Sequence, residues 1–441
     1  MKNNEAGGKR PTILAIGSNL ASAGLTRVMH SIFRQLKSCY EIHYIGIAYK
    51  GPVVEDEGLK IYPSNLKGGD VWGGYQGKDA IASLKPDIVF LMNDLWMLPQ
   101  YLQVFEPHRQ DFKLVVYVPL DGKLVDDKGI YALRSADRFA VYSEFARQEV
   151  EQSMVRLQKQ GSACRFSAVD AIALGVDTSS FYPLPGSVEA QFQGKGRLQA
   201  KQAIFPDEPD LWDSFVVLNA NRPQPRKRID LTLESFALFA RNKPANVKLY
   251  LHHAIMNPAE RAEIVALAKQ FGILERLKLT PVTMERDSPL ERLSPSERLR
   301  LSGMPQALRQ CISDRQLNQI YNACEVGINT AMGEGWGLVS FEHAATGAAQ
   351  IVPQHSACTE SWTGAAVLLN PVKQYVPVFS PLEMAEINPK QAAEALEQFY
   401  CDRNHLQKLS KAACDRANQS QYRWQQIAQQ WEQLLSEMSA P

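Results

Sequence analysis

The stretch VGINTAMGEGWGLVSFEHAATG, residues 326–347, contains in one place the unit from which the rest of the chain is built. A short apolar run predicts a strand over 326–330, a glycine-rich turn follows at 333–337, and helical spacing predicts a helix from about Leu338. The backbone N–H groups of such a turn point at one spot, where the helix N-terminus adds its positive dipole end. The stretch therefore predicts a strand–turn–helix unit with an anion site.

Two carboxylates flank this turn: Glu334 lies within it, and Glu342 lies about one turn into the helix. A carboxylate beside a bound phosphate suits hydroxyl groups, so sugar and ribose hydroxyls are the candidate ligands. The spacing alone is a weak signal, because a second acidic residue falls at a given offset by chance in about one case in ten. One surface glutamate and one glutamate on a helix face is the plain alternative.

The same alternation of a strand-length apolar run and a segment with helical spacing recurs along the chain. It begins with TILAIG (12–17) followed by GLTRVMHSIFRQL (24–36), and it starts again at FVVLNAN (215–221). Alternating strands and helices predict parallel sheets covered by helices on both faces, so we expect an α/β fold with two Rossmann-like domains. The expected bounds are residues 1–200, residues 201–400 and, for C-terminal helices, residues 401–441.

Composition excludes several classes of protein. The 441 residues carry a net charge of +1, which argues against a nucleic-acid partner bound by broad phosphate neutralisation. The seven cysteines form no C-x-x-C pair, no signal-like segment begins the chain, and no apolar run is long enough to span a membrane. We therefore expect a cytoplasmic protein with no membrane span, which leaves room for a peripheral membrane contact.

A basic loop follows the strand that opens the second part of the chain. Residues 222–228 contain four cations, Arg222, Arg226, Lys227 and Arg228, in a protein that is otherwise neutral. Open α/β sheets place their ligands at such strand-to-helix loops, and the expected ligand here is the diphosphate of a leaving group. A solvated basic loop is the alternative.

Other motifs are missing from the sequence. There is no Asp-x-Asp and no His/Cys cluster with metal-ligand spacing, so no metal site is predicted. There is no G-x-x-x-x-G-K-[ST] loop, and the turn over 17–24 is not G-x-G-x-x-G. These absences exclude a P-loop NTPase and count against a dinucleotide oxidoreductase, and no cofactor is expected.

Together these residues resemble the retaining nucleotide-sugar glycosyltransferases of family 4, which have the GT-B fold. Arg222 and Lys227 are similar to the Arg and Lys that this family places on the diphosphate, and Glu334 with Glu342 resembles its E-x7-E motif. Gly24 lies in a turn that resembles the family's Gly-Gly-x-x-Arg turn after the first strand. The resemblance implies two domains facing across a cleft, no metal, and a C-terminal helix that crosses back onto the first domain. All of the C-terminal helices over 401–441 are therefore expected to pack back onto the first domain.

The resemblance also implies roles for individual residues. Glu334 would hold a donor-sugar hydroxyl, Glu342 the nucleotide ribose, and Arg222 with Lys227 the diphosphate. The backbone of the glycine turn would contact donor phosphate or sugar, and Gly24 would let the first domain approach the donor. The residues expected to bind the donor are Gly24, Gly335, Trp336, Gly337, Leu338 and Glu342.

The first domain departs from the family pattern. Family members often carry a His at the end of the strand that here reads VYVPLD (116–121), and this chain has none. Asp121, or Asn93 and Asp94 at the end of the preceding strand, are the candidates to replace it, although each residue type also serves as a turn or helix-cap residue. The expected catalytic residues are Arg222, Lys227, Glu334 and Asp121.

Three further segments have two readings each. Trp72 and Tyr75, on the glycine-rich loop GGDVWGGY (68–75), are candidates with Asn93 and Asp94 for the acceptor side, or else the loop is a surface loop with Trp72 against the core. The charged insert over 283–310 is expected to be a solvated loop, with a lid as the alternative. The apolar stripe from Trp424 to Leu435 must pack on its own chain or on a second copy.

The predicted function is that of a retaining, metal-independent hexosyltransferase. It would move a hexosyl unit from a UDP- or GDP-sugar to a hydroxyl acceptor, which could be a sugar, a lipid-linked group or another hydroxyl compound. A nucleotide-sugar epimerase or a sugar phosphorylase with the same fold is the first alternative, because fold alone does not settle function. A non-catalytic subunit that binds a sugar nucleotide is the second.

Overall fold

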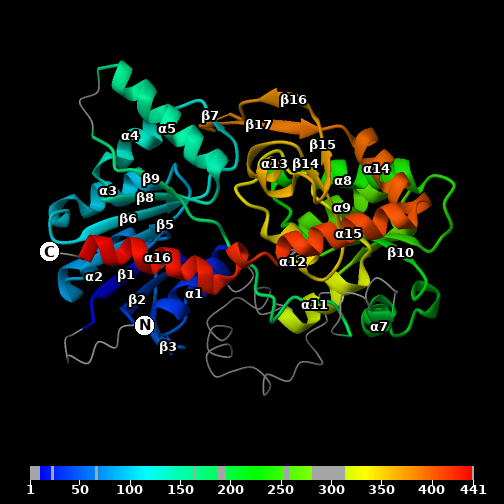
Figure 1. Cartoon of the computed structure of the whole chain (residues 1–441), viewed down its shortest axis with the longest axis horizontal. Helices are drawn as coiled ribbons and strands as arrows, with labels where there is room; N and C mark the ends of the chain where they lie inside the picture. The colour runs from blue at the N-terminus through cyan, green and yellow to red at the C-terminus, as the bar shows by residue number, and fades with distance from the viewer. Residues whose placement is uncertain are drawn as a thin grey trace.

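The computed structural model shows two parallel sheets side by side, each covered by helices (Figure 1). The prediction of an α/β fold with two Rossmann-like domains is confirmed. The insert over 283–310 lies outside the described residues. The structure describes residues 10–20, 24–64, 68–161, 165–185, 195–252, 258–280, 313–378 and 380–439.

The N-terminal domain is built on an eight-stranded sheet whose central strands are continuous apolar runs, buried on both faces as parallel sheets require. Every neighbouring pair in it is parallel except β3 with β4. The strands in spatial order are β3 (Val54–Asp56), β4 (Leu59–Pro63), β2 (Glu41–Ile47), β1 (Thr12–Ser18), β5 (Ile88–Met92), β6 (Lys113–Val118), β8 (Arg138–Val141) and β9 (Val169–Ala171). Its helices are α1 (Gly24–Leu36), α2 (Gly74–Leu84), α3 (Leu98–Phe105), α4 (Lys128–Ala132) and α5 (Glu144–Lys159).

The C-terminal domain repeats this plan with a six-stranded, all-parallel sheet. The strands in spatial order are β12 (Leu277–Leu279), β11 (Val247–Leu251), β10 (Phe215–Asn219), β13 (Val326–Ile328), β14 (Ala349–Pro353) and β15 (Val367–Leu369). Its helices are α7 (Lys195–Ile204), α8 (Ile229–Ala240), α9 (Pro258–Gln270), α11 (Asp314–Ala323), α12 (Leu338–Ala345), α13 (Ser356–Trp362), α14 (Pro389–Cys401) and α15 (Arg403–Ala417). The predicted helix start at Leu338 is the first residue of α12.

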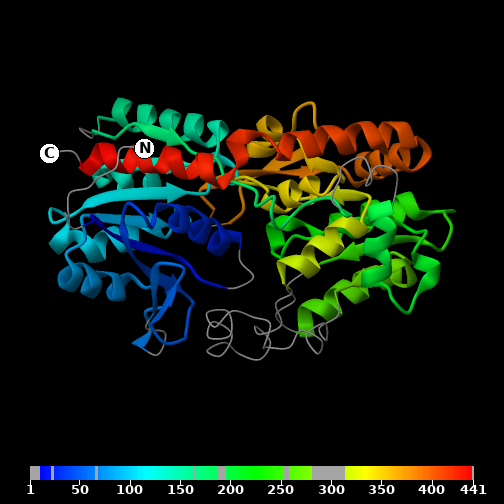
Figure 2. The ribbon, with the colours of Figure 1, turned by 60° about the horizontal axis from the view of Figure 1, so that its bottom comes forward.

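The last helix, α16 (Trp424–Ser439), lies along the N-terminal domain, while α15 lies along the C-terminal domain (Figures 1 and 2). The apolar stripe of α16 is buried, and Trp431 packs edge-on against Phe90 at 4.9 Å and Tyr117 at 4.8 Å between ring centroids. The stripe therefore packs on its own chain. The expectation that all of 401–441 packs on the first domain is wrong for α15, which contacts α12 and β14 through a buried face that includes Ala413.

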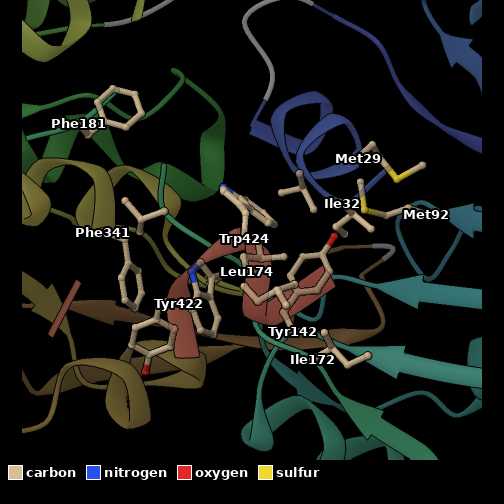
Figure 3. Packing of buried hydrophobic residues seen from close by; sticks show 14 of the residues in the cluster. Met29, Ile32, Met92, Tyr142, Ile172, Leu174, Phe181, Phe341, Tyr422 and Trp424 are labelled. Carbon is tan, nitrogen blue, oxygen red and sulfur yellow. The ribbon is translucent and has the colours of Figure 1, made fainter. Parts of the chain in front are cut away.

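The two domains share a hydrophobic core where the chain crosses between them. Figure 3 shows Tyr422 and Trp424 among the buried residues of this crossing. Tyr422 lies 5.0 Å from the Phe341 ring of the C-terminal domain, and Trp424 packs directly on Gly175 of the N-terminal domain. The residues that connect α15 to α16 therefore pack on both domains and help to hold the two sheets in their relative position.

A small three-stranded sheet also joins the domains. The hairpin β16 (Pro371–Tyr375) and β17 (Leu382–Ile387) of the C-terminal domain pairs antiparallel with β7 (Lys123–Leu124) of the N-terminal domain. Gly122, which precedes β7, passes so close to the carbonyl oxygen of Glu383 that a Cβ there would collide with it. The hairpin thus holds the loop after β6 against the C-terminal domain.

Within the described part of the chain, no helix is both long enough and apolar enough to cross a membrane.

Candidate active site

The glycine turn between β13 and α12 meets the N-terminal domain directly. The Gly335 N–H donates a 2.8 Å hydrogen bond to Oδ1 of Asp121, which lies in the loop after β6. A Cβ at Gly333 would come within 2.5 Å of the Asp121 carbonyl oxygen, so only glycine allows this approach. Gly337 has φ of +92° and turns the chain into α12. The turn and the loop after β6 therefore form one site between the two domains.

Glu334 is the buried charge at the centre of this site. Its side chain accepts hydrogen bonds from Lys227 Nζ at 2.7 and 2.5 Å and from Asn329 Nδ2 at 3.2 Å. Burial opposes ionisation of the carboxyl group, but the neighbouring Lys227 and Arg226 outweigh it and lower the pKa of Glu334 to about 2. Glu334 is therefore ionised at neutral pH.

The four cations of the basic loop have different surroundings. Lys227 is buried against Glu334, whereas Arg226 bridges Asp121 and Glu334, each at 3.3 Å. Arg222 is exposed and makes no ion pair or side-chain hydrogen bond with any other described residue. Arg228 turns away and pairs with Asp230 and with Glu386 of the interdomain hairpin. Lys227 and Arg226 thus contact Glu334 directly, Arg222 interacts with it only electrostatically, and Arg228 belongs to the hairpin.

Arg226 is a site residue that the sequence analysis did not single out. A short 3₁₀ turn over Pro225–Lys227 places Arg226 and Lys227 next to each other, with the Arg226 Nη1 also donating to the Gly333 carbonyl at 2.8 Å. The signal was present in the four-cation loop. The resemblance, however, assigned the diphosphate to Arg222 and Lys227, which are five residues apart, and gave no role to Arg226.

Glu342 faces the N-terminal domain from α12. Its two carboxylate oxygens accept hydrogen bonds from Arg27 of α1 at 3.0 Å and from the Tyr321 hydroxyl of α11 at 2.9 Å. Burial raises the pKa of Glu342 above its ordinary value, although Arg27 and Tyr321 act in the opposite direction. Arg27 also pairs with Asp314 at 2.6 Å, so it bridges the two domains. In the sequence, Arg27 is the arginine of the turn that resembles the family's Gly-Gly-x-x-Arg turn, and nothing else there points to this contact.

The start of α1 lies against the start of α12. A Cβ on Gly24, the first residue of α1, would lie 3.1 Å from the Leu338 side chain, the first residue of α12. The N-termini of the two helices are therefore next to each other, and their positive dipole ends share one region. The expected role of Gly24, which is to let the first domain approach the donor, stays a prediction.

Trp336 is a donor-binding candidate whose side chain points away from the site. Its indole is buried, stacks on Phe341 at 4.9 Å with an interplanar angle of 10°, and meets Tyr422 edge-on at 5.5 Å. Only the backbone of Trp336 lies in the glycine turn. The side chain belongs to the core between the domains.

The acceptor-side candidates lie at the carboxyl end of β5. Asn93 is buried and donates to the Tyr101 hydroxyl at 3.0 Å, and that hydroxyl donates to the Trp72 carbonyl at 2.6 Å. Burial and the nearby Asp121 raise the pKa of Asp94. Asn93 therefore holds the neighbouring loop in place, whereas Asp94 shares the electrostatic surroundings of Asp121.

Trp72 and Tyr75 lie on the surface. Trp72 is 39% exposed and Tyr75 is 66% exposed, so Trp72 is not packed in the core. Trp72 instead meets Trp96, an exposed residue that the sequence analysis did not single out, with 6.1 Å between ring centroids. The only sequence signal for Trp96 was its position two residues after Asp94.

Comparisons with known proteins support the fold. Residues 288–433 match the family model described as glycosyl transferase-like. The chain is similar to a sucrose-phosphate synthase from Thermosynechococcus elongatus, with 16% identity, a TM-score of 0.65, and coverage of 98% of this chain and 99% of that chain. No curated protein matches the sequence.

Two further solved structures are similar over nearly the whole chain. A UDP-forming α,α-trehalose-phosphate synthase from Burkholderia vietnamiensis has 12% identity and a TM-score of 0.66, with coverage of 98% of this chain and 97% of that chain. HepE of Anabaena, solved with UDP-glucose, has 12% identity and a TM-score of 0.63, with coverage of 97% and 99%. The GT-B fold and the likeness to glycosyltransferases are thus confirmed, while membership of family 4 stays a prediction.

Proposed function

We propose that this chain is a glycosyltransferase that moves a hexosyl unit from a UDP-sugar to a hydroxyl acceptor and retains the anomeric configuration. The observation that carries the proposal is the group of Glu334, Lys227, Arg226 and Asp121 at the glycine turn, where the two domains meet. The likeness to HepE, solved with UDP-glucose, and to a UDP-forming synthase supports UDP as the nucleotide.

The donor's diphosphate would lie at the N-terminus of α12. Arg222 is an exposed cation, and Lys227 and Arg226 are already positioned beside Glu334. As the bond between the sugar and the diphosphate lengthens, negative charge grows on the leaving oxygen, and preformed cations and N–H groups stabilise it more than they stabilise the bound donor. These residues would therefore act mainly on the transition state.

The carboxylates would bind hydroxyl groups. Glu334 is ionised and is held by Lys227, so its remaining lone pairs suit a hydroxyl of the donor sugar. Glu342 would accept from a ribose hydroxyl in exchange for one of its present partners. Asp121, one of the candidates to replace the missing His, now binds the Gly335 N–H. It would move onto the donor sugar and release that N–H to the donor.

The chemical step needs only the two substrates and these residues. The acceptor oxygen forms a bond to the anomeric carbon on the face from which the leaving oxygen departs. The bond from the anomeric carbon to the diphosphate breaks, and the acceptor proton passes to a leaving-group oxygen. The products are the glycosylated acceptor and UDP. No metal or cofactor has a step in this proposal.

A thermal-shift panel of UDP, GDP, ADP, dTDP and their sugars tests the donor assignment. A nucleotide at 100 times its Kd should add about 2.7 kcal/mol to the stability of the folded chain. We expect UDP and a UDP-sugar to raise the Tm most, and E334Q to keep the UDP response while losing about 10²–10³ in turnover of the UDP-sugar.

E397Q is the matched control, because the partly exposed Glu397 pairs with Lys243, and within the described part of the chain neither residue forms an ion pair or a hydrogen bond with the glycine turn. No response to any nucleotide would contradict the donor site. Conversion of the UDP-sugar into another sugar nucleotide without an acceptor would contradict the transferase assignment, and inversion of the anomeric proton signal in the product would contradict retention.

A further inference from the structure

Four large apolar side chains are exposed on two neighbouring segments of the N-terminal domain, which meet through Trp72 and Trp96. Val71, Trp72, Tyr75 and Trp96, called here the aromatic platform, have exposed fractions of 46%, 39%, 66% and 53%. Trp72 and Trp96 meet edge-on with an interplanar angle of 87°, so part of each ring faces outward. Large aromatic groups are normally buried, and a group of them on the surface marks a binding site.

The loop that carries the platform is held by buried polar groups. Asp70 is 8% exposed, and its two carboxylate oxygens accept from the N–H groups of Gly74 at 2.9 Å and Gln76 at 2.8 Å. The Trp72 carbonyl accepts from Tyr101, which in turn accepts from the buried Asn93. These bonds fix the start of α2 and the backbone of Trp72, so the rings are presented by a rigid scaffold.

The platform borders the candidate active site. Trp96 follows Asp94 by two residues, in a turn closed by the 2.9 Å bond from the Met97 N–H to the Asp94 carbonyl. Asp94 in turn interacts electrostatically with Asp121, Arg222 and Arg226. The platform is therefore two residues along the chain from Asp94, which interacts with charged residues of the candidate active site.

We propose that the aromatic platform binds a neutral glycan acceptor by stacking of its sugar rings, and this proposal rests on the proposed function. Sugar rings present flat C–H faces that pack on aromatic faces, and their hydroxyl groups donate to carboxylates such as Asp94. The four side chains of the platform carry no charge, so the platform offers no cation to a phosphate, and this favours a neutral acceptor over a sugar phosphate. The platform contains one aliphatic residue among three aromatic ones, a composition that suits sugar rings better than lipid chains.

A printed array of neutral glycans and glucose 6-phosphate, probed with the full chain without a donor, tests the platform. Binding to phosphatidylcholine vesicles is measured alongside it. We expect binding to a subset of neutral glycans, and a loss of at least tenfold in affinity for that subset in W72A and in W96A. Y182A is the matched control, because Tyr182 is an aromatic residue with 41% exposure outside the platform, and it should bind like the unchanged chain. Circular dichroism checks that each variant folds.

The outcomes separate this proposal from the proposed function. UDP should raise the Tm of W72A and W96A as it does for the unchanged chain, since neither residue belongs to the donor site. Glycan binding without any nucleotide response would leave the platform standing and remove the transferase proposal. No binding on the array, unchanged binding by both variants, preferred binding of glucose 6-phosphate over every neutral glycan, or platform-dependent binding to phosphatidylcholine vesicles instead of glycans would overturn the platform proposal.

Discussion

At the scale of single residues, Glu334 shows how a carboxylate stays charged away from water. Moving a lone carboxylate into the interior is costly, and the group would normally take up a proton instead. Lys227 and Asn329 donate directly to it, and Arg226 adds a second cation at 3.3 Å. Part of the positive charge of the basic loop therefore balances a buried carboxylate of the protein itself.

Removal of Lys227 tests this balance. We expect K227M to lower the free energy of unfolding by about 3–5 kcal/mol, because Glu334 is left buried without its main partner. The double variant K227M/E334L should recover most of that loss, since it removes both charges. Urea unfolding measures both values.

K243M is the matched control, because Lys243 pairs with Glu397 at a partly exposed position and should cost at most about 1 kcal/mol. A K227M variant that is as stable as K243M would show that Lys227 does not hold the Glu334 charge.

The lowered pKa of Glu334 predicts a pH dependence of stability. A carboxyl group whose pKa is lower in the folded state contributes stability above its unfolded pKa, and this contribution is lost as the pH falls through the folded pKa. For Glu334 the window runs from about pH 4.5 down to about pH 2. The stability difference between the unchanged chain and E334Q should therefore shrink as the pH is lowered from 5 to 3, as chemical unfolding at each pH would measure. A constant difference across this range would contradict the ion pair.

At the scale of elements, the interdomain sheet explains why the loop after β6 reaches the glycine turn. Two residues of β7 pair with β17, and this pairing starts immediately after Asp121 and Gly122. The sequence does not predict this strand, because a segment of two residues is too short to show the alternation of apolar and polar residues that indicates a strand. The strand forms because the hairpin of the other domain supplies its partner.

Gly122 tests whether this pairing positions Asp121. We expect G122V to lower stability by about 1–3 kcal/mol, because the added side chain collides with the Glu383 carbonyl. It should also reduce turnover of the UDP-sugar, because Asp121 is displaced from Gly335. K123V, one residue further along at an exposed position, is the control for added bulk. Equal turnover in both variants would show that the pairing with the hairpin does not position Asp121.

At the scale of the whole molecule, a shared core and a few polar contacts hold the two domains together. Glu360 of α13 accepts from the N–H groups of Glu144 and Phe145 at the start of α5, at 3.0 and 2.7 Å. Arg27 joins α1 to Glu342 and Asp314. These polar contacts surround the candidate site, so the separation of the domains and the access of a donor are linked.

Arg27 tests this link. We expect R27A to raise the donor Kd by about tenfold and to increase the radius of gyration, because a charged hydrogen bond across the domains, of about 1.5–3 kcal/mol, is lost. Calorimetry and X-ray scattering measure the two effects. R138A is the control, because Arg138 pairs with Asp170 and with Glu437 of α16 within the N-terminal domain. Identical scattering and donor affinity in R27A would show that this contact does not hold the domains.

The sequence by itself determined the α/β class, the two rounds of strand and helix, the helix start at Leu338 and the apolar stripe of the last helix. These features follow from local spacing, which each segment carries in its own residues. The roles of the site residues and the expected domain bounds stay predictions. The resemblance implied that the last helix crosses back onto the first domain, and the structure identifies the residues that cover its stripe, among them Phe90 and Tyr117.

Only the tertiary structure decided which residues meet at the glycine turn. Asp121 and Gly335, and likewise Arg27 and Glu342, are separated by more than 200 residues, and their contacts depend on the approach of two domains. The direction of the Trp336 side chain depends on the core around Phe341. The contact of Arg226 with the site depends on a single short turn over Pro225–Lys227. Local spacing places a residue on an element, but the distance between elements is set by packing of the whole chain.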